Sequence, residues 1–242
     1  MDNEKIEKLQ QMIDESDHIV FFGGAGVSTE SHIPDFRSTD GLYHQTYKYP
    51  PEVMGSHTFY TQHTEEFYDF YKNKMIFLDA KPNKAHLKLA EMERAGKLSA
   101  IVTQNIDGLH QAAGSKNVFE LHGSVHRNYC QKCGKFFDVN YVVNAKGVPY
   151  CDECGGIIKP DVVLYEEGLD SQTINGAVRA ISKADMLIIG GTSLVVYPAA
   201  GMIDYFKGKY LAVLNRDATS RDKQADLCIT DPIGEVLGRI RV

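Results

Sequence analysis

Two closely spaced cysteine pairs constrain the fold of this chain most strongly. Cys130 and Cys133 form one Cys-x-x-Cys pair, Cys151 and Cys154 form another, and seventeen residues separate the pairs. Four thiolates at this spacing can close a tetrahedron around Zn²⁺ with no open position. A glycine follows each pair and allows a tight turn whose N–H groups donate to sulfur. We therefore predict one structural zinc ion.

A nucleic-acid-binding zinc ribbon has the same spacing of cysteines. The acidic Asp152 and Glu153 inside the second pair disfavour contact with phosphate, and the net charge of −6 argues against non-specific nucleic-acid binding. No direct sequence-specific nucleic-acid binding is expected. The fifth cysteine, Cys228, lies in an apolar segment and is expected to be part of the core.

Outside the cysteine region, apolar runs of strand length alternate with amphipathic stretches of helix length. This alternation predicts an α/β fold: a Rossmann-like, mostly parallel sheet with helices on both faces. The expected strands are 18–22, 98–102, 118–121, 186–189, 210–214 and 227–229, and the expected helices include 4–15, 86–95 and 174–182.

Two regions interrupt the alternation. Residues 35–82 are rich in Tyr, Phe and His, and residues 129–165 carry the cysteine pairs. We expect the first to be a helical insertion and the second a zinc-binding module, which together form a smaller lobe. The Rossmann-like domain would then be discontinuous, with the segments 1–34, 83–128 and 166–242.

Polar clusters follow the predicted strands. In open parallel sheets, ligands bind beyond the carboxyl ends of the strands, so these clusters should meet in one crevice. The clusters are 24–28, 103–110, 120–123, 190–193 and 215–217.

The segment from Phe22 to Ser28 is predicted to be a strand that enters a glycine turn. Such a turn lets backbone N–H groups approach a pyrophosphate. The dehydrogenase pattern requires a third glycine where this chain has Thr29, and an acidic ribose ligand near position 46, which is also Thr. The turn is therefore either an unconventional phosphate loop or only a tight turn.

The longer sequence context resembles the sirtuin family of NAD-dependent protein deacylases. Residues 24–38 (GAGVSTESHIPDFRS) resemble its first signature, 103–110 (TQNIDGLH) its second and 121–123 (LHG) its third. The paired cysteines and 190–194 (GGTSL) complete the set in the expected order. The resemblance spans the chain from Gly24 to at least Asn215.

The resemblance implies that the nicotinamide–ribose bond of NAD is broken and that the acetyl group of acetyl-lysine passes to ADP-ribose. His122 would be the general base for a ribose hydroxyl, since imidazole accepts protons at neutral pH. Asp107 would accept from the nicotinamide carboxamide, and Asn105 would hold a ribose hydroxyl or a water. The products would be nicotinamide, O-acetyl-ADP-ribose and deacetylated protein.

The same resemblance assigns further contacts with NAD. Phe36 would shield the cleaved ribose carbon from water, and Arg37 would hold a phosphate. Ile233 would reach the adenine. The remaining expected contacts are Gly24, Ala25, Gly26, Ser28, Thr29, Gln104, Ile106, Thr192, Ser193 and Asn215.

An acetyl-lysine peptide would lie as an added strand along Val162, Val163, Leu164, Tyr165 and Val195. The family usually has Phe-Gly-Glu where this chain has Tyr165-Glu166-Glu167, and the extra carboxylate is expected to favour basic peptides.

Acyl preference is expected to depend on a second departure from the family pattern. Members that remove acidic acyl groups carry Tyr-x-x-Arg, for which this chain has Tyr71 and Lys74. Lysine lacks the bidentate fork of arginine, so acetyl-lysine is the expected substrate.

Two other functions fit the same motifs: a non-catalytic NAD or ADP-ribose sensor, and an enzyme that transfers ADP-ribose to protein. The joint presence of His122, Asn105 and Asp107 speaks against a sensor. No run approaches the roughly 18 apolar residues of a membrane helix, and the N-terminus has no apolar signal core. A cytoplasmic location without membrane contact is expected; the sequence does not define the oligomeric state.

Overall fold

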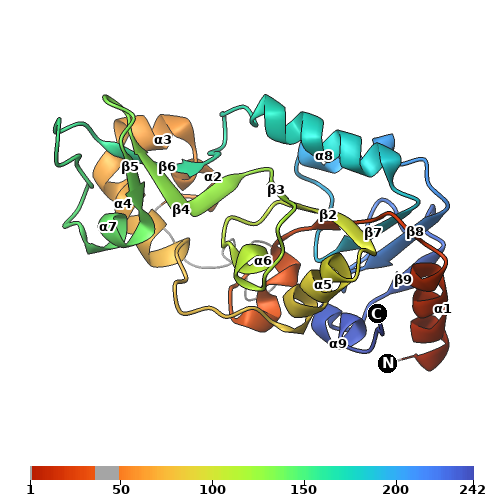
Figure 1. Cartoon of the computed structure of the whole chain (residues 1–242). Helices are drawn as coiled ribbons and strands as arrows, with labels where there is room; N and C mark the ends of the chain where they lie inside the picture. The colour runs from red at the N-terminus through yellow and green to blue at the C-terminus, as the bar shows by residue number, and fades with distance from the viewer. Residues whose placement is uncertain (1, 36–48) are drawn as a thin grey trace.

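The computed structural model describes residues 2–35 and 49–242. Among these residues, six strands form one parallel sheet in the order β3-β2-β1-β7-β8-β9 (Figure 1). The strands are β1 (Ile19–Gly23), β2 (Leu98–Thr103), β3 (Val118–Glu120), β7 (Met186–Gly190), β8 (Tyr210–Leu214) and β9 (Leu227–Ile229). The predicted parallel α/β sheet is confirmed, and each strand lies within one residue of its expected bounds.

Helices cover both faces of this sheet. On one face lie α1 (Asn3–Asp14), α5 (Lys84–Arg94) and α9 (Ile233–Leu237), and on the other lie α8 (Ser171–Lys183) and the 3-10 helix η4 (Ala199–Tyr205) (Figure 1). Alternate residues of β1 enter the two cores because successive side chains of a strand point to opposite faces. Phe21 packs in the core under α5, and Phe22 packs in the core under α8.

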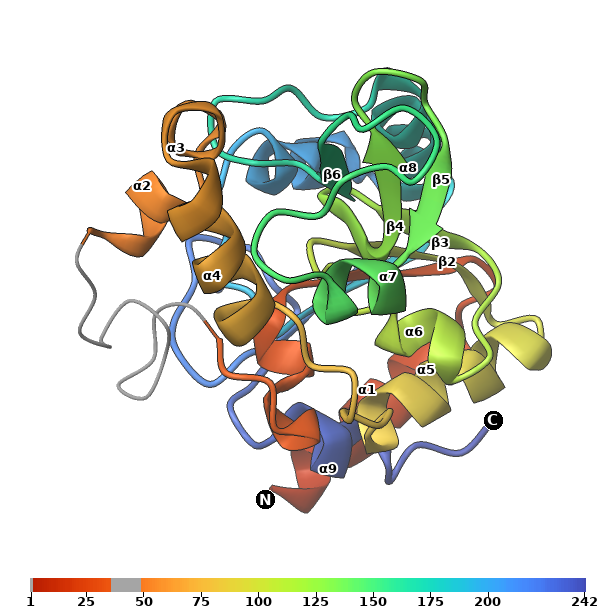
Figure 2. The same cartoon turned by 90° about the vertical axis from the view of Figure 1, so that its left-hand side faces the viewer.

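A smaller lobe lies beside the sheet and combines helices with an antiparallel sheet of order β5-β4-β6 (Figure 2). Its core joins side chains of the helical segment, such as Phe67 and Tyr68, to Val142 and Ile158 of the cysteine-bearing segment. The hydroxyl of Tyr68 also donates to the Ile158 carbonyl. The elements are α2 (Pro51–Met54), α3 (His57–Gln62), α4 (Thr64–Lys74), β4 (Gly123–Cys130), β5 (Phe136–Asp138), α7 (Val139–Asn144) and β6 (Ile158–Val162).

Strand β4 connects the two parts of the molecule. It starts directly after His122 and ends at the metal-ligand candidate Cys130. It pairs with β6 from Gly123, opposite Val162, to Cys130, opposite Ile158. Short helices complete the fold: the 3-10 helices η1 (Ala25–Val27) and η2 (Thr29–Ser31), and α6 (Leu109–Ala112). Within the described ranges, none of the helices has the length and apolar character needed to span a membrane.

Candidate active site and zinc centre

A cavity of about 640 Å³ lies where the carboxyl ends of the central strands meet the small lobe. The strand register places these ends at one level: Gly23 of β1 pairs with Thr103 of β2 and with Gly190 of β7, and Gly190 pairs with Leu214 of β8. The segments that follow these strands therefore open onto one space. Its volume falls within the range that small-molecule and cofactor sites occupy.

The glycine turn after β1 packs directly on the turn after β7. The N–H of Gly24 donates to Gly190 O (3.2 Å), and the N–H of Gly26 donates to Gly191 O (2.8 Å). A Cβ atom at Gly26 would lie 2.8 Å from Gly191 Cα, and one at Gly191 would lie 2.3 Å from Val27 N. Only residues without a side chain permit this approach of two backbones, which leaves a bare backbone surface on the cavity.

Asn105 and Asp107 converge on Ser28. Asn105 Nδ2 donates to Ser28 Oγ (3.1 Å), and Ser28 Oγ donates to Asp107 Oδ2 (2.6 Å). The N–H of Leu109 donates to the other carboxylate oxygen of Asp107 (2.9 Å). This network holds the two side chains predicted from the second signature against the glycine turn of the first.

His122 lines the same cavity, with its Nδ1 atom 3.0 Å from Gln104 O. A carbonyl oxygen only accepts, so Nδ1 carries the proton and Nε2 keeps its lone pair. Burial lowers the pKa of His122, an effect that the hydrogen bond to Gln104 opposes in part. The imidazole is therefore neutral at pH 7 and can accept a proton at Nε2.

Most of the predicted dinucleotide contacts lie together. Gln104 Nε2 donates to Thr192 Oγ1 (2.9 Å), which links the segments after β2 and β7. Phe36 and Arg37 fall outside the described residues. The predicted residues that line the cavity are Gly24, Ala25, Gly26, Ser28, Thr29, Gln104, Asn105, Ile106, Asp107, His122, Thr192, Ser193, Asn215 and Ile233.

The expected peptide segment also borders the cavity. Val162, Val163, Leu164 and Tyr165 line it, and the N–H of Val163 donates to His122 O (3.0 Å). Val195 does not line the cavity in the described structure. Its neighbours Val196, Tyr197 and Pro198 do so instead.

Sequence reasoning missed the apolar wall that the small lobe contributes. Phe70, Met75, Phe77 and Leu78 line the cavity together with Val125. The aromatic-rich composition of residues 35–82 indicated a helical insertion but not which of its side chains would reach the cavity.

Tyr71 and Lys74, the nearest counterparts of the family's Tyr-x-x-Arg pair, are not among the lining residues of the described structure. Tyr71 is fully buried in the core of the small lobe, and burial strongly raises the pKa of its hydroxyl.

The four paired cysteines form one cluster in which all sulfur atoms lie within 4.8 Å of one another. Cys130 Sγ is 3.4 Å from Cys154 Sγ, and Cys133 Sγ is 3.7 Å from Cys151 Sγ. A tetrahedron with Zn–S bonds of about 2.3 Å has S···S edges of about 3.8 Å, so the cluster fits one structural Zn²⁺.

The turns around the cluster match the prediction. Gly134 and Gly155 have φ values of 74° and 67°, and the N–H of Lys132 donates to Cys130 Sγ (3.4 Å). Cys228 is half-buried, packs against the core under α8 and directs its thiol toward Asp222 O (3.7 Å). Its predicted core position is thus only partly met.

Comparison with known proteins assigns the family. A sequence model of the Sir2 family matches residues 24–198, so the chain belongs to the Sir2 family. The NAD-dependent protein deacetylase of Clostridium acetobutylicum is 65% identical over 237 residues, which cover 97% of each chain. The protein of the same name from Clostridium perfringens is 61% identical over 241 residues, 98% of this chain and 99% of the relative.

Solved structures agree with this assignment. A Sir2 structure with a p53 peptide and NAD⁺ has a TM-score of 0.86 and 39% identity, and covers 97% of this chain and 96% of its own. A Sir2 structure with a deacetylated p53 peptide and 3′-O-acetyl ADP-ribose has a TM-score of 0.89 and 39% identity, with 96% coverage of both chains.

Proposed function

We propose that this chain is an NAD-dependent protein-lysine deacetylase. The carrying observation is the cavity that brings His122 together with Asn105, Asp107 and the edge segment at Val163. The bare glycine turn fits the phosphates of a dinucleotide, because backbone N–H groups can approach them without steric hindrance. NAD is therefore the expected co-substrate, and acetyl-lysine peptides and proteins are the expected partners.

NAD would supply a ribosyl carbon with nicotinamide as the leaving group, and the carbonyl oxygen of acetyl-lysine would form a bond to this carbon. Together with one water molecule, the reaction yields nicotinamide, O-acetyl-ADP-ribose and free lysine. His122 accepts the proton of a ribose hydroxyl at Nε2 while Gln104 O fixes the opposite nitrogen. Asp107, held by Ser28 and the Leu109 N–H, orients the carboxamide of the leaving group. The apolar side chains from the small lobe exclude water.

Acetyl-lysine is the proposed acyl substrate. Tyr71 is buried in the lobe core, and neither it nor Lys74 lines the cavity within the described ranges. This pair therefore provides no bidentate hydrogen-bond donor for the carboxylate of an acidic acyl group. Phe70 and Met75 instead present apolar surface to a short acyl chain.

We also propose the division into a discontinuous NAD-binding domain (1–34, 83–128 and 166–242) and a small lobe (35–82 and 129–165). The apolar core of the small lobe supports the presence of two lobes, and because it includes Val125, β4 passes from one lobe into the other. The four-cysteine cluster, which requires reduced thiols, supports a cytoplasmic location.

The decisive test incubates the purified chain with NAD and an acetyl-lysine peptide, with the unmodified peptide as control. We expect one nicotinamide and one O-acetyl-ADP-ribose for each deacetylated peptide. Binding of NAD without turnover would identify a sensor, and ADP-ribose attached to protein would identify a transferase; either result would overturn the proposal. Succinyl peptide in the same assay tests the acyl preference.

A further inference from the structure

We propose that Glu166 is a positioning residue for the peptide substrate: its carboxylate binds the start of helix α3 and thereby fixes the segment along which acetyl-lysine peptides lie. This inference rests on the proposed deacetylase function. It concerns a residue to which the sequence analysis gave a different task, namely attraction of basic peptides.

The backbone of Glu166 is the first observation. Its φ is 76°, in the left-handed region that disfavours residues with a Cβ atom. Glycine would adopt the same backbone at little cost. A glutamate persists in such a conformation only where its surroundings hold it there.

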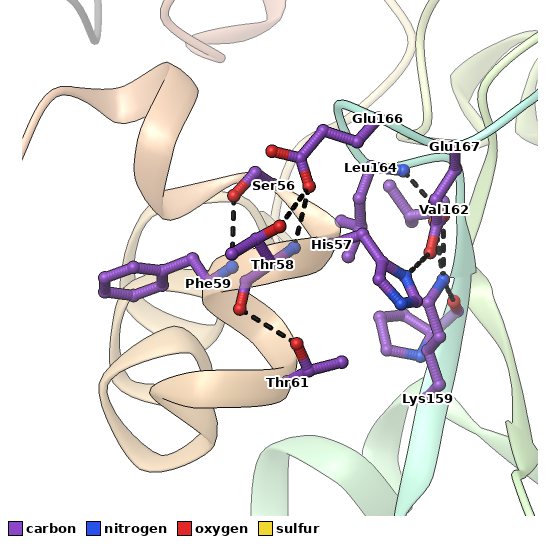
Figure 3. A network of polar contacts seen from close by, with 11 residues as sticks. Ser56, His57, Thr58, Phe59, Thr61, Lys159, Val162, Leu164, Glu166 and Glu167 are labelled. Atoms are coloured by element: carbon purple, nitrogen blue, oxygen red, sulfur yellow. Dashed lines mark hydrogen bonds and ion pairs between the residues drawn. The ribbon is translucent and has the colours of Figure 1, made fainter.

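The side chain of Glu166 supplies that hold. Its Oε2 atom accepts hydrogen bonds from the N–H of Thr58 (2.9 Å) and from Thr58 Oγ1 (2.7 Å) (Figure 3). These bonds, that of the hydroxyl first, lower the pKa of the Glu166 carboxyl, so the carboxylate is charged at neutral pH. We call the contact of Glu166 with Thr58 the carboxylate latch.

The latch lies beside backbone contacts that join the same two segments. The N–H of Tyr165 donates to Gly55 O (3.0 Å), and the N–H of His57 donates to Tyr165 O (3.0 Å). The loop after β6 is therefore attached to the helical part of the small lobe through both backbone groups of Tyr165, and the latch extends this attachment to the next residue.

Glu167 binds a different set of donors beside the latch (Figure 3). Its carboxylate accepts from the N–H of Leu164 (2.9 Å) and lies 2.8 Å from His57 Nδ1 and 3.1 Å from Lys159 Nζ. Both carboxylates are thus engaged by donors of the protein. The Thr58 donors of Glu166 are neutral, so its negative charge remains, and the expectation that the extra carboxylate favours basic peptides stays a prediction.

The attached segment leads directly to the proposed base. The N–H of Val163 donates to His122 O, so the stretch from Val163 to Tyr165 is fixed at one end by His122 and at the other by α3. A peptide that adds as a strand gains affinity when its template edge is already ordered. Loss of the latch should therefore weaken peptide binding and leave the chemistry at His122 and the affinity for NAD unchanged.

The test compares Glu166→Ala and Glu166→Gly with the wild type in the deacetylation assay and in binding of a fluorescent acetyl-lysine peptide. Both variants should raise the peptide KM and Kd about five-fold, a modest effect because the contact is exposed. The kcat and the KM for NAD should stay within about two-fold. Glu166→Gln, which keeps an acceptor oxygen, should recover part of the affinity, and Glu65→Ala, an exposed acid on α4, should behave as wild type.

Thr58→Val removes the hydroxyl donor and serves as the partner variant. If the two residues act through one contact, Thr58→Val combined with Glu166→Ala should weaken peptide binding no more than Glu166→Ala alone. Wild-type peptide affinity in both Glu166→Ala and Glu166→Gly would overturn the latch, as would an equal loss of kcat. A wild-type enzyme without deacetylation would instead refute the function on which the inference rests.

Discussion

Strand β1 of the central sheet is buried along its whole length, whereas β4 of the small lobe exposes His126 and Tyr129 and ends at Cys130. The first strand has helices on both faces, so apolar burial stabilises it. The second belongs to a three-stranded sheet with the cysteine cluster at one end. The comparison shows that one molecule uses two sources of stability, and that the proposed active site lies between them.

Zinc removal should produce the largest difference in stability between the small lobe and the central sheet. Structural zinc sites contribute on the order of 10 kcal/mol to folding, and apo sites rarely remain formed. We expect Cys151→Ser, or treatment with a strong chelator, to unfold the small lobe. The helices that cover the central sheet should keep their circular dichroism signal. Metal analysis and hydrogen exchange of β4 and β5 measure this.

Cys228→Ser is the matched control, because Cys228 lies outside the cluster. It should retain one zinc per chain. A zinc-free preparation with full protection of β4 in reducing buffer would contradict the dependence of the small lobe on metal.

The next largest effect is expected at the junction of the two regions. His122→Ala removes the proposed base, so the rate of deacetylation should fall about 10²–10⁴-fold. Binding of NAD by calorimetry should be largely preserved, and the exposed His18→Ala should match wild type. Retained turnover would exclude His122 from the mechanism.

A core substitution tests the sheet region by itself. Leu89 of α5 is fully buried among residues of α1, β1 and α9. Leu89→Ala should cost about 3 kcal/mol of unfolding free energy in a urea titration, because it leaves a cavity. The zinc content should stay at one ion per chain; a loss of zinc would show that the two regions are not independent.

The smallest expected effect is a pH dependence of the sheet side. Burial lowers the pKa of His110 to about 3 and that of His86 to about 4, and the two rings lie 4.8 Å apart. The unfolded chain binds protons below about pH 6.5, whereas the folded protein does so only near these lower values. The contribution of these two neutral histidines to the free energy of unfolding is therefore fully present above pH 6.5 and decreases as the pH falls toward 4.

His110→Leu should remove part of this decrease in unfolding free energy at acidic pH, up to about 2 kcal/mol between pH 6.5 and 4.5. Unfolding titrations at fixed zinc content measure it. His18→Gln, a change at an exposed histidine, provides the baseline. An unchanged slope in the His110 variant would show that folding does not shift the pKa of His110.

The sequence predicted the features that depend on short stretches of chain. The cysteine pairs, the glycine turn and the second signature with Asn105 and Asp107 are each short local stretches, and the residues named from them lie together in the structure. The strands of the sheet follow from apolar runs for the same reason.

Other features depend on contacts between distant segments and could not be read from the sequence. Glu166 binds Thr58, 108 residues earlier, and no local pattern marks this pair. Tyr71 matches a family position but points into the lobe core, because helix periodicity alone does not say which neighbour covers each face. Val195 was expected to border the peptide, but residues 196–198 line the cavity instead.

One continuous strand of eight residues, roughly 26 Å long at about 3.3 Å per residue, runs from the proposed base at position 122 to the first metal ligand at position 130. A reaction that uses no metal thus takes place at a site that one strand joins to the zinc centre. Oxidants that modify the thiolates, or chelators that remove the zinc ion, should therefore inactivate the enzyme from the far end of this strand, without contact with the nucleotide or the modified lysine.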